Sequence, residues 1–426
     1  MSVEKVALGL LGMGTVGTGV LRLLEQNGSL MAERQGVSLW IKRALVRDPA
    51  RPRPGIPAGI LTSDPRLVLD DPEIRVIVEV MGGTSPAREH VTAALRAGKA
   101  VVTANKELVA DYGRELYRAA DQGGSGLFFE ASVGGGIPIL GPLKQSLAAN
   151  RVGRLAGILN GTSNYILTRM SEAGLGFAEA LQEAQAEGYA EADPSADVEG
   201  HDTARKLAIL ASIAFGTRVT SRDIRVDGIT GVGHADIVYG QELGWEVKLL
   251  GRAEVHPGGL WLRVGPTFVP REHPLAGVRG VYNAIMVHAD AAGTLMFYGR
   301  GAGAGPTASA VVGDVLEALR QAGGRANGCT CRGTASMAGP DQVAGRYYLR
   351  LEVTDRPGVL SEVAGVMAAH GISLHSVIQK RLTQAGAELV FVTHEAPEGQ
   401  VRAAAARLSR LDTVHRVAAV LSVGIS

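Results

Sequence analysis

The sequence predicts an α/β protein in three successive parts: a doubly wound parallel sheet, an α+β domain, and a small module of βαββαβ order. Three observations lead to this fold class. Short apolar runs alternate with helical patterns over residues 5–130, as a parallel sheet requires. A Gly/Pro segment at 134–138 ends this alternation. Residues 345–426 then place two helical segments among four strand-like ones, the order of a ferredoxin-like module.

The first part opens with a strand, a glycine turn and a helix. An apolar strand over 5–11 runs into Gly12-Met-Gly14-Thr-Val-Gly17. The first glycine makes the turn, the second lets backbone approach a pyrophosphate, and the third lets the helix pack on the strand. Phosphates would bind at the helix N-terminus. We therefore expect a Rossmann-like dinucleotide-binding domain over 1–135.

Strands and helices alternate through the rest of this domain. The expected strands cover 39–46, 75–80, 100–103 and 127–130, and the expected helices cover 86–97 and 107–122. Ligands of such sheets bind at the carboxyl ends of the strands. Lys106, which follows the strand over 100–103, is therefore expected at the ligand edge.

The middle part, residues 136–321, is expected to be an α+β domain for substrate binding and dimerisation. Its expected strands cover 155–159, 245–250, 260–264 and 283–289. A glycine-rich stretch from Tyr298 to Thr307 opens a helix over 306–320, which we expect to pack back on the first domain. Pro306 suits the first helical position and leaves N–H groups for an anion, although an ordinary helix cap explains the same residues.

Within this part, Asp202-Thr-Ala-Arg-Lys206 is the most informative stretch. The carboxylate and the amine are four positions apart, hence on one face of a helix. The apolar residues that follow place Lys206 where water is scarce, and there an ammonium gives up its proton more easily. An acidic cluster lies upstream and contains Glu191, Asp193, Asp197 and Glu199. Taken alone, such a pair more often just supports a helix by about a few tenths of a kcal/mol.

The C-terminal part consists of an expected linker over 322–344 and the module over 345–426. The expected strands of the module cover 347–353, 372–381, 388–393 and 414–423, and its helices cover 359–370 and 399–408. The turn Asp355-Arg-Pro-Gly358 precedes the first of these helices.

Composition excludes several classes of protein. The 426 residues carry a net charge of +1 with no long run of either sign, which argues against a nucleic-acid or membrane-surface binder. No apolar run is long enough to span a membrane, and Met1–Leu11 lacks the apolar stretch of a signal peptide. Cys329 and Cys331 are the only cysteines and cannot form a disulfide framework; two ordinary thiols are expected. A reducing, cytoplasmic compartment follows.

Several motifs in one order give the chain a resemblance to homoserine dehydrogenases. They are the glycine turn, Thr103-Ala-Asn-Lys106-Glu107, Glu130-Ala-Ser-Val133-Gly-Gly-Gly-Ile137-Pro138, Asn160-Gly-Thr-Ser-Asn164-Tyr165 and Asp202–Leu207. The C-terminal part resembles an ACT-type amino-acid-binding domain, with Asp355-Arg-Pro-Gly358 as its signature. The resemblance implies interconversion of aspartate semialdehyde and homoserine with a nicotinamide cofactor, in the branch leading to threonine and methionine.

The resemblance also implies roles for individual residues. Lys206 resembles the proton donor to the aldehyde oxygen, and Lys106 the second active-site lysine, near both cofactor and substrate. Asp202 and Glu191 resemble the carboxylates that hold the substrate's amino group, and we place Asp197 with them. The implied cofactor contacts are Gly12, Met13, Gly14, Thr15, Val16, Gly17, Thr103, Lys106, Gly188 and Gly303, and the position of Arg47 after the second strand adds it as a further candidate. Backbone carbonyls of Glu130, Val133, Gly135 and Ile137 match a loop for a monovalent cation, usually sodium, with potassium as the other candidate.

The chemistry fits these residues. Hydride addition to a carbonyl makes an alkoxide, which needs a nearby cation that also supplies a proton. For the cofactor, Val46-Arg47-Asp48 offers an arginine where a 2′-phosphate would lie, with other arginines nearby, which favours NADPH. Asp48 leaves NADH open, since an acid there would bind a ribose hydroxyl.

Other interpretations remain open. One is a different dehydrogenase on the same scaffold, acting on another amino-acid-derived carbonyl compound. Another is a catalytically silent amino-acid sensor, against which the set of two lysines and two acids argues. The C-terminal module is either a sensor of an amino acid such as threonine or a dimerisation module, in a homodimer or homotetramer. His201 is expected to be a cap or surface residue.

Overall fold

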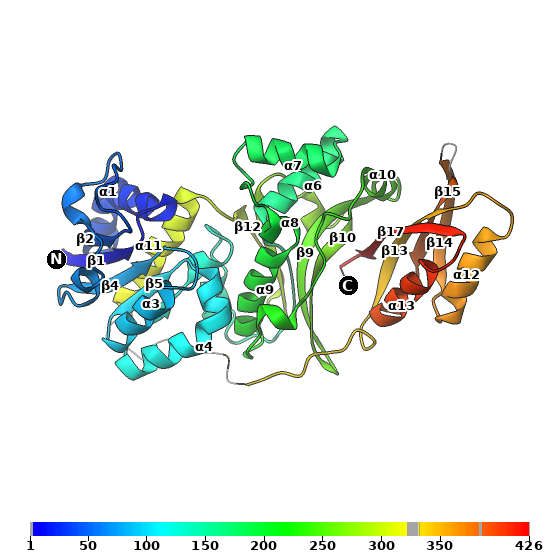
Figure 1. The fold of residues 1–426 in the computed structure, drawn as a ribbon. Coiled ribbons are helices and arrows are strands. Elements are labelled where there is room, and N and C mark those ends of the chain that lie inside the picture. The colour runs from blue at the N-terminus through cyan, green and yellow to red at the C-terminus, as the bar shows by residue number, and fades with distance from the viewer. Residues whose placement is uncertain (1–2, 322–330, 332, 383–385, 426) are drawn as a thin grey trace. The chain divides into compact units, whose positions relative to one another are not determined.

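The structure is a computed structural model that describes residues 3–321, 331, 333–382 and 386–425 (Figure 1). The chain forms two compact units that are interleaved in the sequence. The first unit contains 1–152, 205–221 and 289–334, and the second contains 153–204, 222–288 and 335–426. The domain boundaries expected at 135, 321 and 344 stay predictions. The expected linker lies partly outside the described residues, as does Cys329.

The first unit is built on a parallel sheet in the order β3-β2-β1-β4-β5-β6. Its strands are β1 Glu4–Leu11, β2 Val37–Leu45, β3 Leu61–Thr62, β4 Ile74–Glu79, β5 Ala100–Thr103 and β6 Leu127–Phe128. Its other elements are α1 Thr15–Gln35, α2 Arg66–Leu69, α3 Ala87–Arg96, α4 Lys106–Gly123, α5 Leu140–Lys144, β12 Gly293–Arg300 and α11 Ala304–Arg320. Because β1 pairs with both β2 and β4, the strand order reverses beside it, where such sheets bind ligands.

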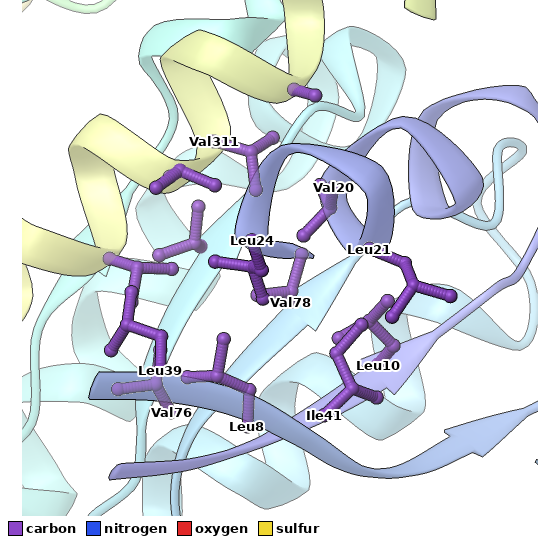
Figure 2. Close-up of a cluster of buried hydrophobic side chains, with 14 of the residues drawn as sticks. Leu8, Leu10, Val20, Leu21, Leu24, Leu39, Ile41, Val76, Val78 and Val311 are labelled. Atoms are coloured by element: carbon purple, nitrogen blue, oxygen red, sulfur yellow. The ribbon is translucent and has the colours of Figure 1, made fainter. Parts of the chain in front are cut away.

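The core of the first unit joins segments that are far apart in the sequence. Leu8 and Leu10 of β1 and Val78 of β4 lie beneath Val20 of α1, all with no exposed surface. Val311 of α11 packs on the same cluster, as Figure 2 shows. Burying a side chain of this size stabilises a fold by about 1.5–3 kcal/mol. The helix after the glycine-rich stretch is therefore part of the core of the first unit.

The second unit is built on a mixed sheet in which β11, β7, β9, β10, β17, β13, β15 and β14 follow one another. The strands are β7 Val152–Ile158, β8 Arg225–Val226, β9 Trp245–His256, β10 Gly259–Pro270, β11 Tyr282–Ala289, β13 Ala344–Val353, β14 Leu374–Leu382, β15 Gly386–Thr393, β16 Ala396–Pro397 and β17 Val414–Val423. The helices are α6 Gly161–Ala173, α7 Phe177–Ala186, α8 Ser195–Val198, α9 His201–Ala214, α10 His234–Glu242, α12 Val359–Ala369 and α13 Glu398–Leu408. Residues 201–204 of α9 belong to the second unit, and its residues from Arg205 on belong to the first.

The C-terminal module has the expected βαββαβ order, and its sheet continues that of the middle part. Its two helices cover one face of β13, β14, β15 and β17, with Val363 and Leu408 buried there (Figure 1). Strand β17 pairs with β10 in parallel through Thr267–Ser422 and Phe268–Val423. The predicted fold class is therefore confirmed, with the two sheets joined edge to edge.

Three local expectations need correction. The strand expected over 127–130 ends at Phe128, because Glu130 opens a 3₁₀ turn. The helix expected to begin at Pro306 begins at Ala304, with Gly303 as its cap. The start of the glycine-rich stretch belongs to β12, which ends at Arg300. Among the described helices, none is long and apolar enough to cross a membrane.

Candidate active site

The glycine turn of the first unit has the geometry that its sequence predicts. Gly12 has φ +106°, and a Cβ there would lie 2.7 Å from the carbonyl oxygen of Val80. A Cβ on Gly17 would lie 2.5 Å from the carbonyl oxygen of Gly12, so the helix reaches the strand only without a side chain. At Gly14 no atom lies within 4 Å of the Cβ position, which leaves backbone open to a ligand. The three glycines therefore make a cradle that fits a pyrophosphate.

A cavity of about 850 Å³ opens beside this turn. Of the predicted cofactor residues, it is lined by Gly12, Met13, Gly14 and Arg47. Its lining also includes Arg22, Asp48, Arg51 and Arg53. The Asp48 carboxylate accepts a hydrogen bond from the Ala50 N–H at 2.9 Å, so part of its hydrogen-bonding capacity is used within its own turn. The cavity has the size of a nucleotide site and a basic wall.

The other predicted cofactor residues lie in different places. Thr15, Val16 and Gly17 form the first turn of α1, and Gly303 caps α11 in the same unit. Gly188 follows α7 in the second unit, with φ +74°. The Thr103 hydroxyl donates to Glu79 and accepts from the Asn105 N–H at 2.9 Å. The hydrogen of the Thr103 hydroxyl is therefore already used within the protein.

Lys106 is the first residue of α4, directly after the carboxyl end of β5. Asn105 caps this helix: its Oδ1 accepts from the Leu108 N–H at 3.1 Å, and its Nδ2 donates to the Gly83 carbonyl at 2.6 Å. Arg205 Nη1 lies 3.0 Å from Glu107 Oε1. Glu107 follows Lys106, and Arg205 precedes Lys206. The ion pair therefore links the start of α4 to the part of α9 that belongs to the first unit. Lys206 is 8% exposed.

In the second unit, Asp197 and Asp202 are brought together by a residue that sequence reasoning did not single out. Asn160 Nδ2 donates to Asp197 Oδ1 at 2.7 Å and to Asp202 Oδ2 at 2.9 Å. Asn160 also caps α6, where its Oδ1 accepts from the Ser163 N–H at 2.8 Å. An asparagine directly before a helical segment is a known cap signal, and Asn160 opens the motif Asn160-Gly-Thr-Ser-Asn164-Tyr165. The sequence around Asn160 contains no pattern that predicts its hydrogen bonds to the two acids, which lie 37 and 42 residues away.

The remaining predicted acid of the second unit, Glu191, lies on an exposed loop. Its backbone carbonyl accepts from Gln185 Nε2 at 3.1 Å, and the nearby Tyr189 carbonyl accepts from the Thr162 hydroxyl at 2.7 Å. Glu191 is therefore held through its backbone by α7, and Tyr189, two residues before it, is held by the start of α6. His201 is exposed and lies 3.3 Å from Glu199, consistent with the surface role expected for it.

The predicted cation loop, residues 130–137, is largely buried. Val133, Gly135 and Ile137 are buried, and Gly135 has φ +56°. The Glu130 carboxylate accepts from the N–H groups of Ile139, Leu140 and Gly141 at 2.6, 2.7 and 2.6 Å, so it caps the turn that begins α5. Among the described residues, no group of three or more His, Cys, Asp and Glu side chains is arranged to hold a metal. A cation here would rely on backbone carbonyls.

The C-terminal module has a cavity of its own, of about 350 Å³. It is lined by residues 353–360, which contain the expected turn, together with Gln379 and Leu389. Gly358 has φ +94° at the start of α12, so the turn ends in a conformation that favours glycine. The module thus presents a small polar cavity at its predicted ligand loop.

A parallel sheet of this order, with a glycine turn beside a nucleotide-sized cavity and Lys106 at its carboxyl edge, is typical of a nicotinamide-nucleotide-dependent oxidoreductase. Three family models match the chain. They are "Homoserine dehydrogenase, NAD binding domain" over 12–130, "Homoserine dehydrogenase" over 138–316, and "ACT domain" over 347–413.

Relatives match along nearly the full chain. A homoserine dehydrogenase of Synechocystis is 44% identical, with 98% of this chain and 99% of the relative covered. The crystal structure of a homoserine dehydrogenase from Thiobacillus denitrificans is 41% identical, covers 99% of both chains, and has a TM-score of 0.93. A hyperthermophilic archaeal homoserine dehydrogenase in complex with NADPH is 26% identical, covers 75% of this chain and 98% of that one, and has a TM-score of 0.62. The chain belongs to the homoserine dehydrogenase family.

Proposed function

We propose that this enzyme reduces L-aspartate 4-semialdehyde to L-homoserine, reversibly, with Lys206 as the proton donor. The bound cofactor supplies the hydride to the aldehyde carbon. The Lys206 ammonium stabilises the charge that develops on the oxygen and then transfers a proton to it, which completes the alcohol. The observation that carries this assignment is a lysine only 8% exposed, in the turn after the buried Asp202.

The other roles follow from charge. The substrate carries an ammonium, for which we propose Glu191, Asp197 and Asp202 as the binding carboxylates. We propose that Lys106, at the end of β5, orients the substrate beside the cofactor. Sharing this work among several charged groups fixes the aldehyde carbon in one orientation toward the hydride donor.

The Lys206→Ala variant tests the assignment. We expect kcat to fall by about 10²–10⁴-fold, the usual contribution of a general acid, with NADPH binding nearly unchanged. Lys5→Ala, at an exposed lysine of β1, is the matched control and should keep full activity. Turnover by Lys206→Ala equal to the parent enzyme would remove Lys206 from this role.

For the cofactor, we propose a preference for NADPH. Arg47 and its neighbouring arginines line the nucleotide cavity, and Asp48 uses an oxygen within its own turn. We expect Arg47→Ala to lower kcat/KM for NADPH by about 10–100-fold and for NADH by about threefold or less, since a charged hydrogen bond to a phosphate is lost only with NADPH. Arg34→Ala, an exposed arginine of α1, serves as the control. Equal losses with both cofactors would contradict the preference.

We also propose that the carbonyls of Glu130, Val133, Gly135 and Ile137 bind sodium or potassium. The buried turn with positive φ at Gly135 supports this, because such turns direct carbonyls to one side. The melting temperature should rise with sodium or potassium chloride and less with choline chloride at equal ionic strength. Equal shifts in all three salts would count against a cation site.

For regulation, we propose that an amino acid such as threonine binds the cavity of the C-terminal module. Arg356 lines this cavity and offers a guanidinium to a carboxylate. Initial rates should fall when threonine is added, and Arg356→Ala should weaken the inhibition without changing the rate in its absence. If neither threonine nor any other added amino acid changed the initial rate, a purely structural module would be favoured.

Finally, we propose a homodimer or homotetramer in the cytoplasm, acting in threonine and methionine biosynthesis. The exposed edge strand β14 of the module supports an oligomer, because an unpaired strand edge can pair with another chain. The low number of cysteines supports the cytoplasm. Light scattering at several protein concentrations tests the oligomer.

A further inference from the structure

Asn160 uses both ends of its amide. It is 5% exposed and caps α6, and its Oδ1 accepts from the Ser163 N–H at 2.8 Å and the Ser163 hydroxyl at 2.9 Å. On the other side, its Nδ2 donates to Asp197 at 2.7 Å and to Asp202 at 2.9 Å. An asparagine amide offers two acceptor positions and two donor hydrogens, so this network matches its full capacity.

The network also fixes the orientation of the amide. If the amide were rotated by a half turn, its oxygen would face two carboxylate oxygens, and its NH₂ would face the N–H of Ser163. Both contacts would be repulsive. The two acids lie in α8 and at the start of α9, whereas the amide comes from the cap of α6. One side chain therefore holds two carboxylates that separate elements supply.

The start of α6 is itself anchored. A Cβ on Gly161 would lie 2.8 Å from the Val281 carbonyl oxygen, so the backbone approaches closely there. One turn later, Asn164 Nδ2 donates to the carbonyls of Val278, Gly280 and Tyr282 at 3.3, 2.9 and 3.1 Å. Because this end of α6 is pinned to the 278–282 segment, the Asn160 amide has a fixed position.

We propose that Asn160 is a positioning residue, which holds Asp197 and Asp202 in the geometry that binds the substrate's ammonium. This inference rests on the proposed function. The amide is neutral, so it orders the two carboxylates without cancelling their charge, and its charge-assisted hydrogen bonds offset their mutual repulsion. Outer groups of this kind decide whether a binding group is held closely enough to work.

The Asn160→Ser variant separates this role from helix capping. Serine caps helices about as well as asparagine, but it has no amide to bridge the acids. We expect KM for aspartate semialdehyde to rise by about 10–100-fold, from the loss of hydrogen bonds to charged groups, with kcat within about threefold. KM for L-homoserine in the reverse direction should rise by the same factor, and KM for NADPH should not change.

Ser163→Ala is the matched control, because it removes a bond on the other side of the same amide and leaves both carboxylate bonds. Its KM for aspartate semialdehyde should stay within about threefold of the parent value. A parent-like KM in Asn160→Ser, an equal rise in Ser163→Ala, or a loss confined to kcat would overturn the inference.

A second variant covers the case in which Asn160→Ser melts well below the parent enzyme. Asn160→Thr also caps helices through its hydroxyl and has no amide to bridge the acids, so it should show the same rise in KM for aspartate semialdehyde. A parent-like KM in this variant would overturn the inference. If the unmutated enzyme did not turn over aspartate semialdehyde, the proposed function and this inference would both be wrong. If the unmutated enzyme were active and the Asn160 variants kept its KM, only this inference would be wrong.

Discussion

Two pairs of carboxylates in the second unit are each bridged by one side chain, and the bridging groups differ in charge. Arg350 donates to Asp236 through Nε at 2.7 Å and Nη2 at 3.0 Å, and to Glu388 through Nη1 at 2.8 Å. Asn160 bridges Asp197 and Asp202 in the corresponding way, with a neutral amide. The first bridge brings a full positive charge to its acids, whereas the second brings none.

The Arg350 cluster joins the C-terminal module to the middle part of the chain. Arg350 and Glu388 lie on β13 and β15, and Asp236 lies on α10. Tyr348 donates to Asp236 at 3.0 Å, and Tyr239 donates to Glu388 at 2.7 Å. Burial lowers the pKa of Arg350, but the hydrogen bonds and charges of the two acids raise it by more. These acids are committed to the fold.

If Asp197 and Asp202 bind the substrate as proposed, the contrast separates acids that bind a ligand from acids that support the fold. Where a guanidinium sits between two carboxylates, their charge is largely met within the protein. Where an amide sits between them, the bridge orders the two acids and brings no positive charge of its own. We propose that the ammonium of the substrate binds at this second pair of acids. The charge of the bridging group is thus more informative than the number of acids in a cluster.

The largest expected effect comes from removing the charged bridge. Arg350→Met leaves Asp236 and Glu388 buried without their cation, so the free energy of unfolding should fall by about 3–5 kcal/mol. The shift of the urea midpoint measures this loss. Arg416→Met is the control: the Arg416 side chain is 63% exposed and lies 3.5 Å from Glu352, so its loss should cost less than about 1 kcal/mol. Equal costs would mean that the Arg350 cluster does not hold the module in place.

A carboxyl in the first unit extends the contrast to an acid that a backbone N–H contacts. Asp314 on α11 accepts from the Glu130 N–H at 2.8 Å. Burial raises the pKa of Asp314 to about 7, and the charge of Glu130 adds to the effect. The folded state therefore keeps a proton that the unfolded chain loses near pH 4. Stability should fall as pH rises from about 4 to about 7.

Asp314→Asn should remove this pH dependence. The variant should match the parent enzyme at pH 4 and exceed its free energy of unfolding at pH 8 by about 2–4 kcal/mol, because one unit of pKa corresponds to about 1.4 kcal/mol. Urea unfolding at both pH values, in buffers without sodium or potassium, measures the difference. Asp121→Asn, at an exposed residue of α4, is the control and should show no such gain. A stabilisation of equal size at pH 4 would contradict the raised pKa.

Local patterns made much of the fold predictable. The strands over 100–103 and 414–423 have the bounds that the sequence predicts, because each is an apolar segment between polar or turn residues. The glycine turn and the Asp202–Lys206 spacing are also local, since their geometry depends on residues within one turn. Helix α6 was missed because Gly161-Thr-Ser-Asn164 has a low helix propensity, and the cap at Asn160 defines its start.

What the sequence did not predict depends on distant pairings. Asn160 meets its acids 37 and 42 residues away, and Arg350 meets Asp236 across 114 residues. Before the fold is known, nothing near either residue distinguishes its bridging role from an ordinary cap or strand residue. Strand β12 was missed for a related reason, because no residue in it is fully buried and its pattern merges with the glycine-rich stretch that follows.

The smallest expected change in stability gives the most direct test of the contrast, because the same substitution is made in both pairs. Asp197→Asn removes one of two like charges that share an amide, and the new side-chain oxygen still accepts from Asn160. Its free energy of unfolding should stay within about 1 kcal/mol, while KM for aspartate semialdehyde rises about tenfold as the ammonium loses a partner.

Asp236→Asn, in the other pair, should do the reverse. It leaves Arg350 with less negative charge than its burial requires, so the free energy of unfolding should fall by about 3 kcal/mol. KM for aspartate semialdehyde should not change in the fraction that remains folded. Urea unfolding and initial rates on both variants decide between the two outcomes. If Asp197→Asn destabilised the protein as strongly as Asp236→Asn and left KM unchanged, both acid pairs would be structural, because the neutral bridge would then hold acids that the fold itself requires.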